Sequence, residues 1–262
     1  MDRKPADQNA SHVQSVDRAL ILLDYLASED REIGLTEIAR ALGWPKTTTH
    51  GLISTLRNRH YVDQSPKTGR YRLGVRLFEL GNIVARSWDI RAVARPAMQD
   101  LSLHLGEMVQ LACESDGEVL YIEKIDSTQM MRIVSEIGAR LPMHCTGLGK
   151  VLLAYKHASE VEWIISKHGQ RAMTSHTITS AKALEKELAK IRRQGYAIDD
   201  REIMESLRCV AAPIFDQGGE VQYALSVSAL ADSLTGERLD TACEMLLRTA
   251  QSVSYQIGYR QS

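Results

Sequence analysis

Two helical patterns separated by a glycine and a proline constrain the fold of this chain most. The pattern "EIARAL" follows Thr36, which we expect to cap it, and it ends before Gly43, a residue type often found just past a helix end. Pro45 disfavours helical backbone at Trp44 and keeps the next helix, residues 46–59, separate. The β-prone runs "YVDQ" and "RYRLG" then flank the turn "SPKTG", which indicates a hairpin. The combination predicts a winged helix-turn-helix.

The length of 262 residues allows two domains, since one domain usually takes ~100–200 residues. A first helix is indicated by the apolar stripe Val16, Ala19, Leu20, Leu22, Leu23 and Leu26. We expect residues 1–11 to be a flexible tail, residues 12–74 the winged helix-turn-helix and residues 75–88 a linker helix.

From residue 89 the pattern changes to mixed strands and helices. One helix is expected from about Ile90 to Leu105, kinked or restarted at Pro96. The runs "MVQLACE", "EVLYIEKI", "MRIVSEIG", "LRCVAAPIF" and "YALSVSAL" are strand-like, and helices are expected over Gly147–Tyr155, Ser180–Gln194 and Glu237–Ile257. The whole chain is therefore predicted to be α+β, with a sensor-like α+β domain over residues 89–262.

Composition and cysteine spacing exclude several kinds of protein. No apolar run approaches the ~18 residues of a membrane span, and the start "MDRKPADQNA" lacks the apolar stretch of a secretion signal. We therefore expect a cytoplasmic protein with no membrane partner. Cys113, Cys145, Cys209 and Cys243 form no C-x-x-C pair and have no histidine at metal-ligand spacing, so we expect reduced thiols, no metal and no cofactor.

Positive charge is concentrated in one short segment. Residues 40–76 carry eight basic side chains and one acidic one, a net charge of +7, although the formal charge of the whole chain is −1. Such a patch is typical of proteins that bind a phosphate backbone, although it also occurs as a solvated face. Because it overlaps the helix-turn-helix, it favours double-stranded DNA as a partner.

The run "WPKTTTH" places three β-branched threonines at the start of the second helix of this motif. On a helical wheel, Thr49 falls on the face that packs against the other helices, and Thr47 and His50 fall on the opposite face. We expect Thr47 and His50 to meet base edges, and Thr48, Lys46 and Arg57 to hold phosphates. The alternative is that the threonines only cap the helix start.

The predicted hairpin carries further positive charge. Lys67, Arg70 and Arg72 surround its turn, where they would reach the adjacent groove or backbone of DNA, or else form a charged edge that discourages strand pairing. The full set of side chains expected to contact DNA is Thr36, Lys46, Thr47, Thr48, His50, Ser54, Arg57, Lys67 and Arg70.

The segment "LPMHCTGLGKVLLA" indicates a site for a small anion in the second domain. It places Cys145, Thr146 and Gly147 at a helix start, where unpaired N–H groups and the helix dipole favour negative charge. A small carboxylate fits this chemistry. The run "GLGK" lacks the G-x-x-x-x-G-K-[ST] spacing of a phosphate loop, so we do not expect a nucleotide.

An enzymatic or a purely architectural second domain is the remaining alternative. Cys145 adjoins His144, and Cys209 with His176 would offer another thiol–imidazole pair, but no nucleophile motif surrounds either cysteine. We therefore expect no catalytic residue. An architectural DNA-binding protein would not need so large a second domain.

Seven blocks of sequence, from about His12 to Gly258, resemble the IclR family of bacterial transcriptional regulators. They are "QSVDRALILLDYLA", "LTEIARALGWPKTTTHGLISTL", "YVDQSPKTGRYRLG", "YIEKI", "GARLPMHCTGLGKVLLA", "GYAIDD" and "LRCVAAPIFDQGGEV". The resemblance implies a GAF/PAS-like effector-binding domain and dimers that often pair into tetramers. It also implies effector contacts at Ile133, Leu141, Gly147, Leu148, Asp199, Leu207, Cys209, Ser226 and Ser228.

Within that implied site, backbone N–H groups of Gly147 and Leu148 would hold a carboxylate and Asp199 would meet a ligand hydroxyl. Leu148 is bulkier than the alanine of some relatives, which affects the size of the pocket. Family members often have serine in place of Thr47 and arginine near Gly51, so the operator sequence does not transfer.

These observations predict a ligand-responsive transcriptional regulator, most simply a repressor, that binds a palindromic operator as a dimer or tetramer. The runs "YIEKI" and "GLGKVLLAY" resemble the branch that governs sugar-acid catabolism, which implies an aldonic or 2-keto-3-deoxy acid as the small carboxylate effector. An aromatic acid or a short keto acid, with activation in place of repression, stays open.

Overall fold

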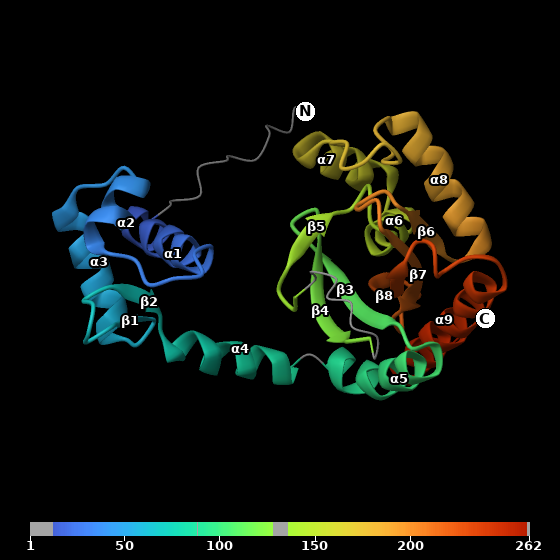
Figure 1. Cartoon of the computed structure of the whole chain (residues 1–262), viewed down its shortest axis with the longest axis horizontal. Coiled ribbons are helices and arrows are strands. Elements are labelled where there is room, and N and C mark those ends of the chain that lie inside the picture. The colour runs from blue at the N-terminus through green and yellow to red at the C-terminus, as the bar shows by residue number, and fades with distance from the viewer. Residues whose placement is uncertain (1–12, 88, 128–135, 261–262) are drawn as a thin grey trace, which may run out of the picture. The chain divides into compact units, whose positions relative to one another are not determined.

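The computed structural model describes residues 13–87, 89–127 and 136–260. The chain divides into two compact units, residues 1–88 and 89–262, and each is described by itself (Figure 1).

Within its described residues, the first unit contains helices followed by a two-stranded sheet and a further helix. The elements are α1 (Gln14–Ala27), α2 (Leu35–Ala41), α3 (Lys46–Asn58), β1 (Val62–Gln64), β2 (Tyr71–Leu73) and α4 (Val75–Ser87). Strands β1 and β2 pair antiparallel. A core of buried side chains joins the helices to this hairpin: Leu22, Leu26, Ile33, Ile38, Ile53, Val62 and Tyr71. The predicted winged helix-turn-helix is confirmed.

The turn between α2 and α3 depends on Gly43, whose φ is +66°. This left-handed conformation is accessible to glycine without steric cost, and it lets the Trp44 N–H donate to the Ala39 carbonyl at 2.9 Å. Pro45 then precedes α3 directly, as the sequence predicts.

One expectation for the first helices is wrong. Thr36 does not cap α2, because the N-cap position is Gly34 and Thr36 lies inside the first turn. The chain enters α2 earlier because Ile33 is tied to Tyr71 by a hydrogen bond from its N–H (2.9 Å). In α1, Leu22 and Leu26 supply the buried contacts, whereas Val16 and Leu20 are more than half exposed.

The second unit is built around a six-stranded antiparallel sheet in the order β5-β4-β3-β8-β7-β6. Its elements are α5 (Asp89–Leu105), β3 (Met108–Ser115), β4 (Glu118–Ile125), β5 (Arg140–Pro142), α6 (Gly147–Ala154), α7 (Ala158–His168), α8 (Ala181–Gln194), β6 (Ala197–Asp200), β7 (Leu207–Phe215), β8 (Val221–Leu230) and α9 (Gly236–Gln256). Helices α5 and α9 pack against one face, and α6 packs between the other face and α8 (Figure 1). The predicted α+β class is confirmed.

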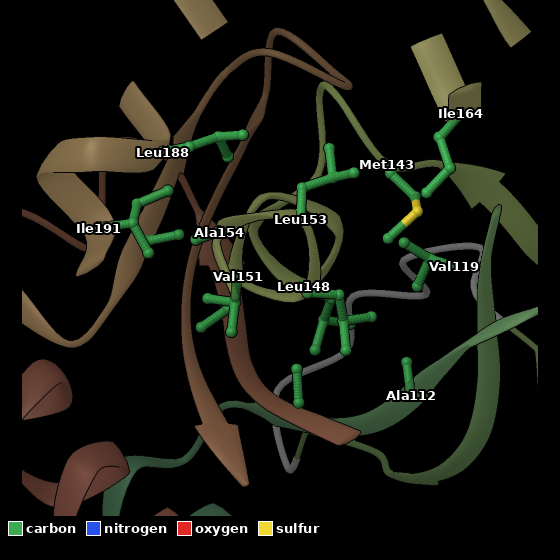
Figure 2. Packing of buried hydrophobic residues seen from close by; sticks show 14 of the residues in the cluster. Ala112, Val119, Met143, Leu148, Val151, Leu153, Ala154, Ile164, Leu188 and Ile191 are labelled. Carbon is green, nitrogen blue, oxygen red and sulfur yellow. The ribbon is translucent and has the colours of Figure 1, made fainter. Parts of the chain in front are cut away.

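Helix α6 is buried along its whole length. Its side chains Leu148, Val151 and Leu153 belong to one apolar cluster with Leu188 and Ile191 of α8 (Figure 2). Because α6 is held between the sheet and α8, the start of α6 is fixed against the strands.

The sequence patterns missed α7, β5 and β6, and of the two alternatives at Pro96 the restarted helix is wrong. Helix α7 buries only Ile164 fully, so its apolar periodicity is weak. Strands β5 and β6 have three and four residues, too few for a clear alternation. Pro96 lies inside a continuous α5. Most of the run "MRIVSEIG" lies outside the described residues.

Candidate functional site

Every side chain expected to contact DNA lies at the surface of the first unit, and none is buried. Thr36 is exposed on α2; Lys46, Thr47, His50 and Arg57 are exposed and Thr48 and Ser54 half-buried on α3; Lys67 and Arg70 are exposed in the β1–β2 turn. The surface therefore presents hydroxyl, imidazole and cationic groups on one short helix and the adjoining wing.

The three threonines of "WPKTTTH" have different environments. Thr49 is fully buried, and its hydroxyl donates to the Pro45 carbonyl at 3.1 Å. The N-cap position of α3 is Pro45, and no side chain caps the helix. The hydroxyls of Thr47 and Thr48 make no hydrogen bond within the described chain. The capping alternative therefore fails, and two of the three hydroxyls are available to an external partner.

The lysines and arginines expected to contact DNA fall into two groups. Arg57 donates to Gln64 Oε1 at 2.5 Å, and Arg70 lies 3.9 Å from Glu37, so these arginines hold the hairpin to the helices. Lys46 and Lys67 are exposed and make no ion pair with any described residue. Of the four, the two lysines are therefore the ones available to phosphates without breaking an internal contact.

The second unit contains a partly open cavity of about 90 Å³ under the start of α6. Its lining is Gln110, Tyr121, Leu141, Thr146, Gly147, Leu148, Asp199, Ile203, Met204, Leu207, Cys209, Ser226 and Ser228. Eight of the nine residues expected to contact an effector line this cavity, and the ninth, Ile133, lies outside the described residues. Strands distant in the sequence thus bring the expected residues together.

Strand register explains how the polar part of this lining forms. Asp199 on β6 lies opposite Cys209 on β7, and Cys209 lies opposite Ser228 on β8. Ser226 of β8 lies opposite Gln110 of β3. Since alternate residues of a strand share one face, these side chains form a continuous polar row on the face that α6 covers.

The start of α6 supplies the anion-binding end of the cavity. Thr146 caps the helix, its hydroxyl accepting from the Gly149 N–H at 3.1 Å. The N–H groups of Gly147 and Leu148, in the first turn, have no helical carbonyl to bond. A Cβ on Gly147 would lie 3.3 Å from the Cβ of Ala211 and 3.8 Å from that of Asp199. Glycine therefore lets the helix start approach the strands closely enough to close the cavity.

The hydroxyl groups of the pocket are already ordered. Ser228 Oγ lies 2.8 Å from Gln110 Oε1 and 3.1 Å from Cys209 Sγ, and Ser226 Oγ lies 3.4 Å from the same Gln110 oxygen. This arrangement fixes Ser228 between two partners and leaves its oxygen able to accept a further hydrogen bond from a ligand.

The two pocket-proximal thiols are unsuited to nucleophilic chemistry. Burial raises the pKa of Cys145 to about 12 and raises the pKa of Cys209 still further, so both are neutral near pH 7. His144 Nε2 lies 3.0 Å from the Arg171 carbonyl, and His176 pairs with Glu205 at 3.6 Å. Among the described side chains, neither histidine makes a hydrogen bond to a cysteine, so the thiol–imidazole pairs considered from the sequence do not form.

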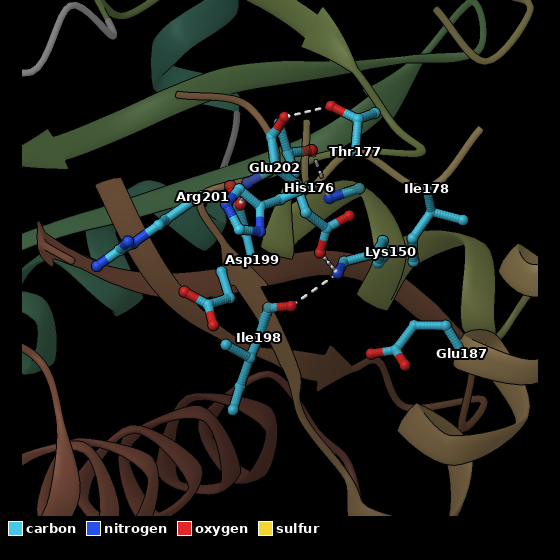
Figure 3. A network of polar contacts seen from close by, with 12 residues as sticks. Lys150, His176, Thr177, Ile178, Glu187, Ile198, Asp199, Arg201 and Glu202 are labelled. Atoms are coloured by element: carbon cyan, nitrogen blue, oxygen red, sulfur yellow. Dashed lines mark hydrogen bonds and ion pairs between the residues drawn. The ribbon is translucent and has the colours of Figure 1, made fainter. Parts of the chain in front are cut away.

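A buried ionic cluster lies beside the pocket (Figure 3). Lys150 is 1% exposed; its Nζ donates to the Ile198 carbonyl at 2.6 Å and forms an ion pair with Glu202. The Glu202 N–H donates to Asp199 Oδ1 at 2.8 Å, and Thr177 donates to the Glu202 carbonyl at 2.6 Å. The cluster connects α6 to the chain that leaves β6, and its Asp199 also lines the pocket.

Sequence reasoning missed five residues of the lining: Gln110, Tyr121, Thr146 as a lining side chain, Ile203 and Met204. A signal was present for Gln110, because a polar residue interrupts the apolar strand "MVQLACE". Ile203 and Met204 lie in the β6–β7 connection, whose position depends on the buried ion pair and could not be inferred from periodicity.

Two further structural facts bear on function. No helix among the described residues is long and apolar enough to cross a membrane. In the same part of the chain, no three histidine, cysteine, aspartate or glutamate side chains gather in a way that could hold a metal ion.

Comparison with known proteins agrees with both units. Residues 15–66 match the IclR helix-turn-helix domain, and residues 83–255 match the bacterial transcriptional regulator IclR C-terminal domain. The HTH-type transcriptional regulator XynR of Escherichia coli K12 is 37% identical over 247 residues, which cover 94% of this chain and 98% of XynR. The transcriptional repressor IclR of the same strain is 34% identical over 261 residues, which cover 98% and 95% of the two chains.

Solved structures give the same result. An IclR transcriptional regulator from Alicyclobacillus acidocaldarius superimposes with a TM-score of 0.82 at 30% sequence identity, covering 94% of this chain and all of that one. The fold, the sequence identity and the two matched domains indicate the same family along almost the whole length of this chain. The chain therefore belongs to the IclR family of bacterial transcriptional regulators.

Proposed function

We propose that this regulator is a repressor of a carbohydrate or sugar-acid catabolic operon and that it senses a small carboxylate in the pocket under α6. It acts in the cytoplasm, binds a palindromic operator as a dimer or tetramer, and catalyses no reaction. The observation that carries the proposal is that the start of α6 at Gly147 and Leu148 lines one cavity together with Asp199, Cys209, Ser226 and Ser228.

The DNA-binding half of the proposal is supported by the free surface of α3. Thr47 and His50 would read base edges, and Lys46 and Lys67 would hold phosphates, because these groups are exposed and have no competing ion pair within the described residues. We propose repression because a similar protein is named transcriptional repressor IclR.

The size of the cavity separates the candidate effectors. A cavity of ~150 Å³ is known to hold benzene, so about 90 Å³ accommodates only a handful of non-hydrogen atoms. A short keto or hydroxy acid fits this space, and a six-carbon sugar acid needs the wall to move at the exposed Met204. Short keto or hydroxy acids are therefore the second class of candidate effector, and the volume of the cavity favours them.

Point variants test the DNA-binding surface. Thr47→Ala should lower discrimination between operator and random DNA by ~1–3 kcal/mol, because a base contact is lost. Lys46→Ala should weaken binding to both DNAs similarly and reduce the salt slope by about one unit. Gel shifts at several salt concentrations measure both quantities. An equal loss on both DNAs for Thr47→Ala would contradict base reading.

A thermal-shift panel tests the pocket. Pyruvate, gluconate, 2-keto-3-deoxygluconate and 4-hydroxybenzoate are each added, and an acid that binds the folded state raises the melting temperature. Ser228→Ala should lose the shift, and Ser233→Ala, at a half-buried serine outside the pocket, should keep it. Consumption of any acid that binds would contradict the non-enzymatic role.

A further inference from the structure

Asp199 lines the pocket and lacks a hydrogen-bond partner, among the described residues, for one of its two carboxylate oxygens. Its side chain is fully buried, and its Oδ1 accepts the Glu202 N–H at 2.8 Å. Its other oxygen, Oδ2, is buried and has no hydrogen-bond partner among the described residues, although Asp199 lines the cavity. A buried carboxylate oxygen without a partner costs free energy, and a proton on that oxygen would remove the buried charge.

The charges around Asp199 do not neutralise it. Lys150, on α6, lowers the pKa of Asp199, although its Nζ is also engaged by Glu202 and the Ile198 carbonyl. Glu202, in the β6–β7 connection, repels it. The remaining titratable groups that face it are neutral when protonated: Tyr121 on β4, Cys145 before α6 and Cys209 on β7. One cation therefore stands between two carboxylates.

Burial raises the pKa of Asp199 to about 7, against the opposing effects of Lys150 and of the Glu202 and Ile203 N–H groups. An acid bound at the Gly147 and Leu148 N–H groups would bring another carboxylate into the same cavity. Two carboxylates in one small site disfavour ionisation of both, so the occupied pocket would hold the proton more tightly than the empty one.

We propose that Asp199 acts as a neutral hydrogen-bond donor when the pocket is occupied: its Oδ2–H donates to an acceptor oxygen of the effector, and the effector anion binds together with one proton. This proposal rests on the acid-sensing role of the pocket. It reverses the role expected from the sequence, in which Asp199 accepts a hydrogen bond from a ligand hydroxyl.

A pH dependence follows with a definite sign. The binding-competent form carries the proton, so affinity is constant below the pKa of free Asp199 and falls above it. With a pKa of about 7, affinity at about pH 8 should be roughly tenfold lower than at about pH 6. Above neutrality each binding event should take up close to one proton from solution.

Asp199→Asn separates a donor from an acceptor. The amide keeps an oxygen for the Glu202 N–H and places a permanent N–H donor where Oδ2 stood. The variant should bind the acid with an affinity that no longer depends on pH. Asp200→Asn is the matched control, since Asp200 is exposed, pairs with Arg208 at 2.6 Å and is not in the pocket.

The first arm of the experiment uses the protein without ligand. Carboxyl-carbon NMR of aspartate-labelled full-length chain, assigned with Asp199→Asn, should give a titration midpoint for Asp199 near neutrality. A midpoint near the ordinary value of about 4 would overturn the proposal whatever the pocket binds.

The second arm is calorimetry with pyruvate in two buffers of different ionisation enthalpy. Proton uptake by wild type and Asp200→Asn above neutrality, absent in Asp199→Asn, would support the proposal. Binding without proton uptake, or loss of binding in Asp199→Asn at every pH, would overturn it. If neither pyruvate nor any other acid of the thermal-shift panel binds wild type at about pH 6, acid sensing itself fails, and the NMR midpoint still reports the state of Asp199 separately.

Discussion

The DNA-binding face of α3 and the pocket under α6 are built in opposite ways. On α3, the groups proposed to act are exposed, and the buried core consists of other residues such as Thr49 and Ile53. In the pocket, Asp199, Ser226 and Ser228 are themselves part of the buried interior. Substitutions on α3 should therefore change binding with little effect on folding, whereas substitutions around the pocket should change both.

The largest effect is expected for Lys150→Met. Removing this cation leaves Glu202 buried without its partner, which should destabilise the second unit by ~3–5 kcal/mol. Lys190→Met, which removes an exposed lysine whose Nζ lies 3.8 Å from the half-buried Glu187 Oε2, should cost less than about 1 kcal/mol. Denaturant melts of both variants measure the difference, and similar losses would contradict the distinction.

The second largest effect is expected for Gly149→Ala, which should destabilise the second unit by about 3 kcal/mol. A Cβ at this position would overlap the Cα and carbonyl oxygen of Met143 and lie 2.6 Å from Thr146 Oγ1. Backbone atoms cannot move aside as a side chain can, so α6 would lose its cap or shift. Hydrogen exchange should show faster opening of α6 with no change in α3. Unchanged protection of α6 would contradict this packing.

The pH dependence of stability is a smaller effect. The pKa of Asp199 is raised in the folded state to about 7, so the folded chain binds this proton more tightly than the unfolded chain. The contribution is present at low pH and is lost as pH rises through about 7. Between about pH 6 and about pH 8 the second unit should lose about 1.4 kcal/mol, and Asp199→Asn should remove that loss. Denaturant melts at both pH values test it.

Gly51→Ala should have the smallest effect, and in the stabilising direction. Nothing lies within 4 Å of a Cβ at this exposed position, so alanine should stabilise α3 by about 0.5–1 kcal/mol. Thermal melts measure this gain. If operator affinity nevertheless falls, the surface of α3 at Gly51 approaches DNA too closely for a methyl group, and the absence of any gain would mean that the helix is limited elsewhere.

The first unit was largely predictable because its signals are local. Gly43 and Pro45 mark the turn, and the wheel of α3 places Thr49 inside and Thr47 outside. The start of α2 was misplaced because it depends on a bridge between Ile33 and Tyr71, residues distant in the sequence.

The pocket was predictable only in part, and from the family resemblance, not from local sequence patterns. The resemblance supplied eight side chains that line the cavity, but periodicity alone could not bring four strands and a helix start together. Lys150 shows the limit most clearly: its sequence context suggested a failed phosphate loop, and its partner Glu202 is 52 residues away. Long-range ion pairs of this kind leave no short-range pattern.

The most direct test of the account is whether the two regions are coupled. Operator affinity is measured by fluorescence anisotropy with and without a saturating acid that binds the pocket, and acid affinity is measured with and without operator. The account predicts that both affinities change by the same factor, within about 5–150-fold, in wild type and not in Ser228→Ala. Equal operator affinity with and without bound acid would contradict it.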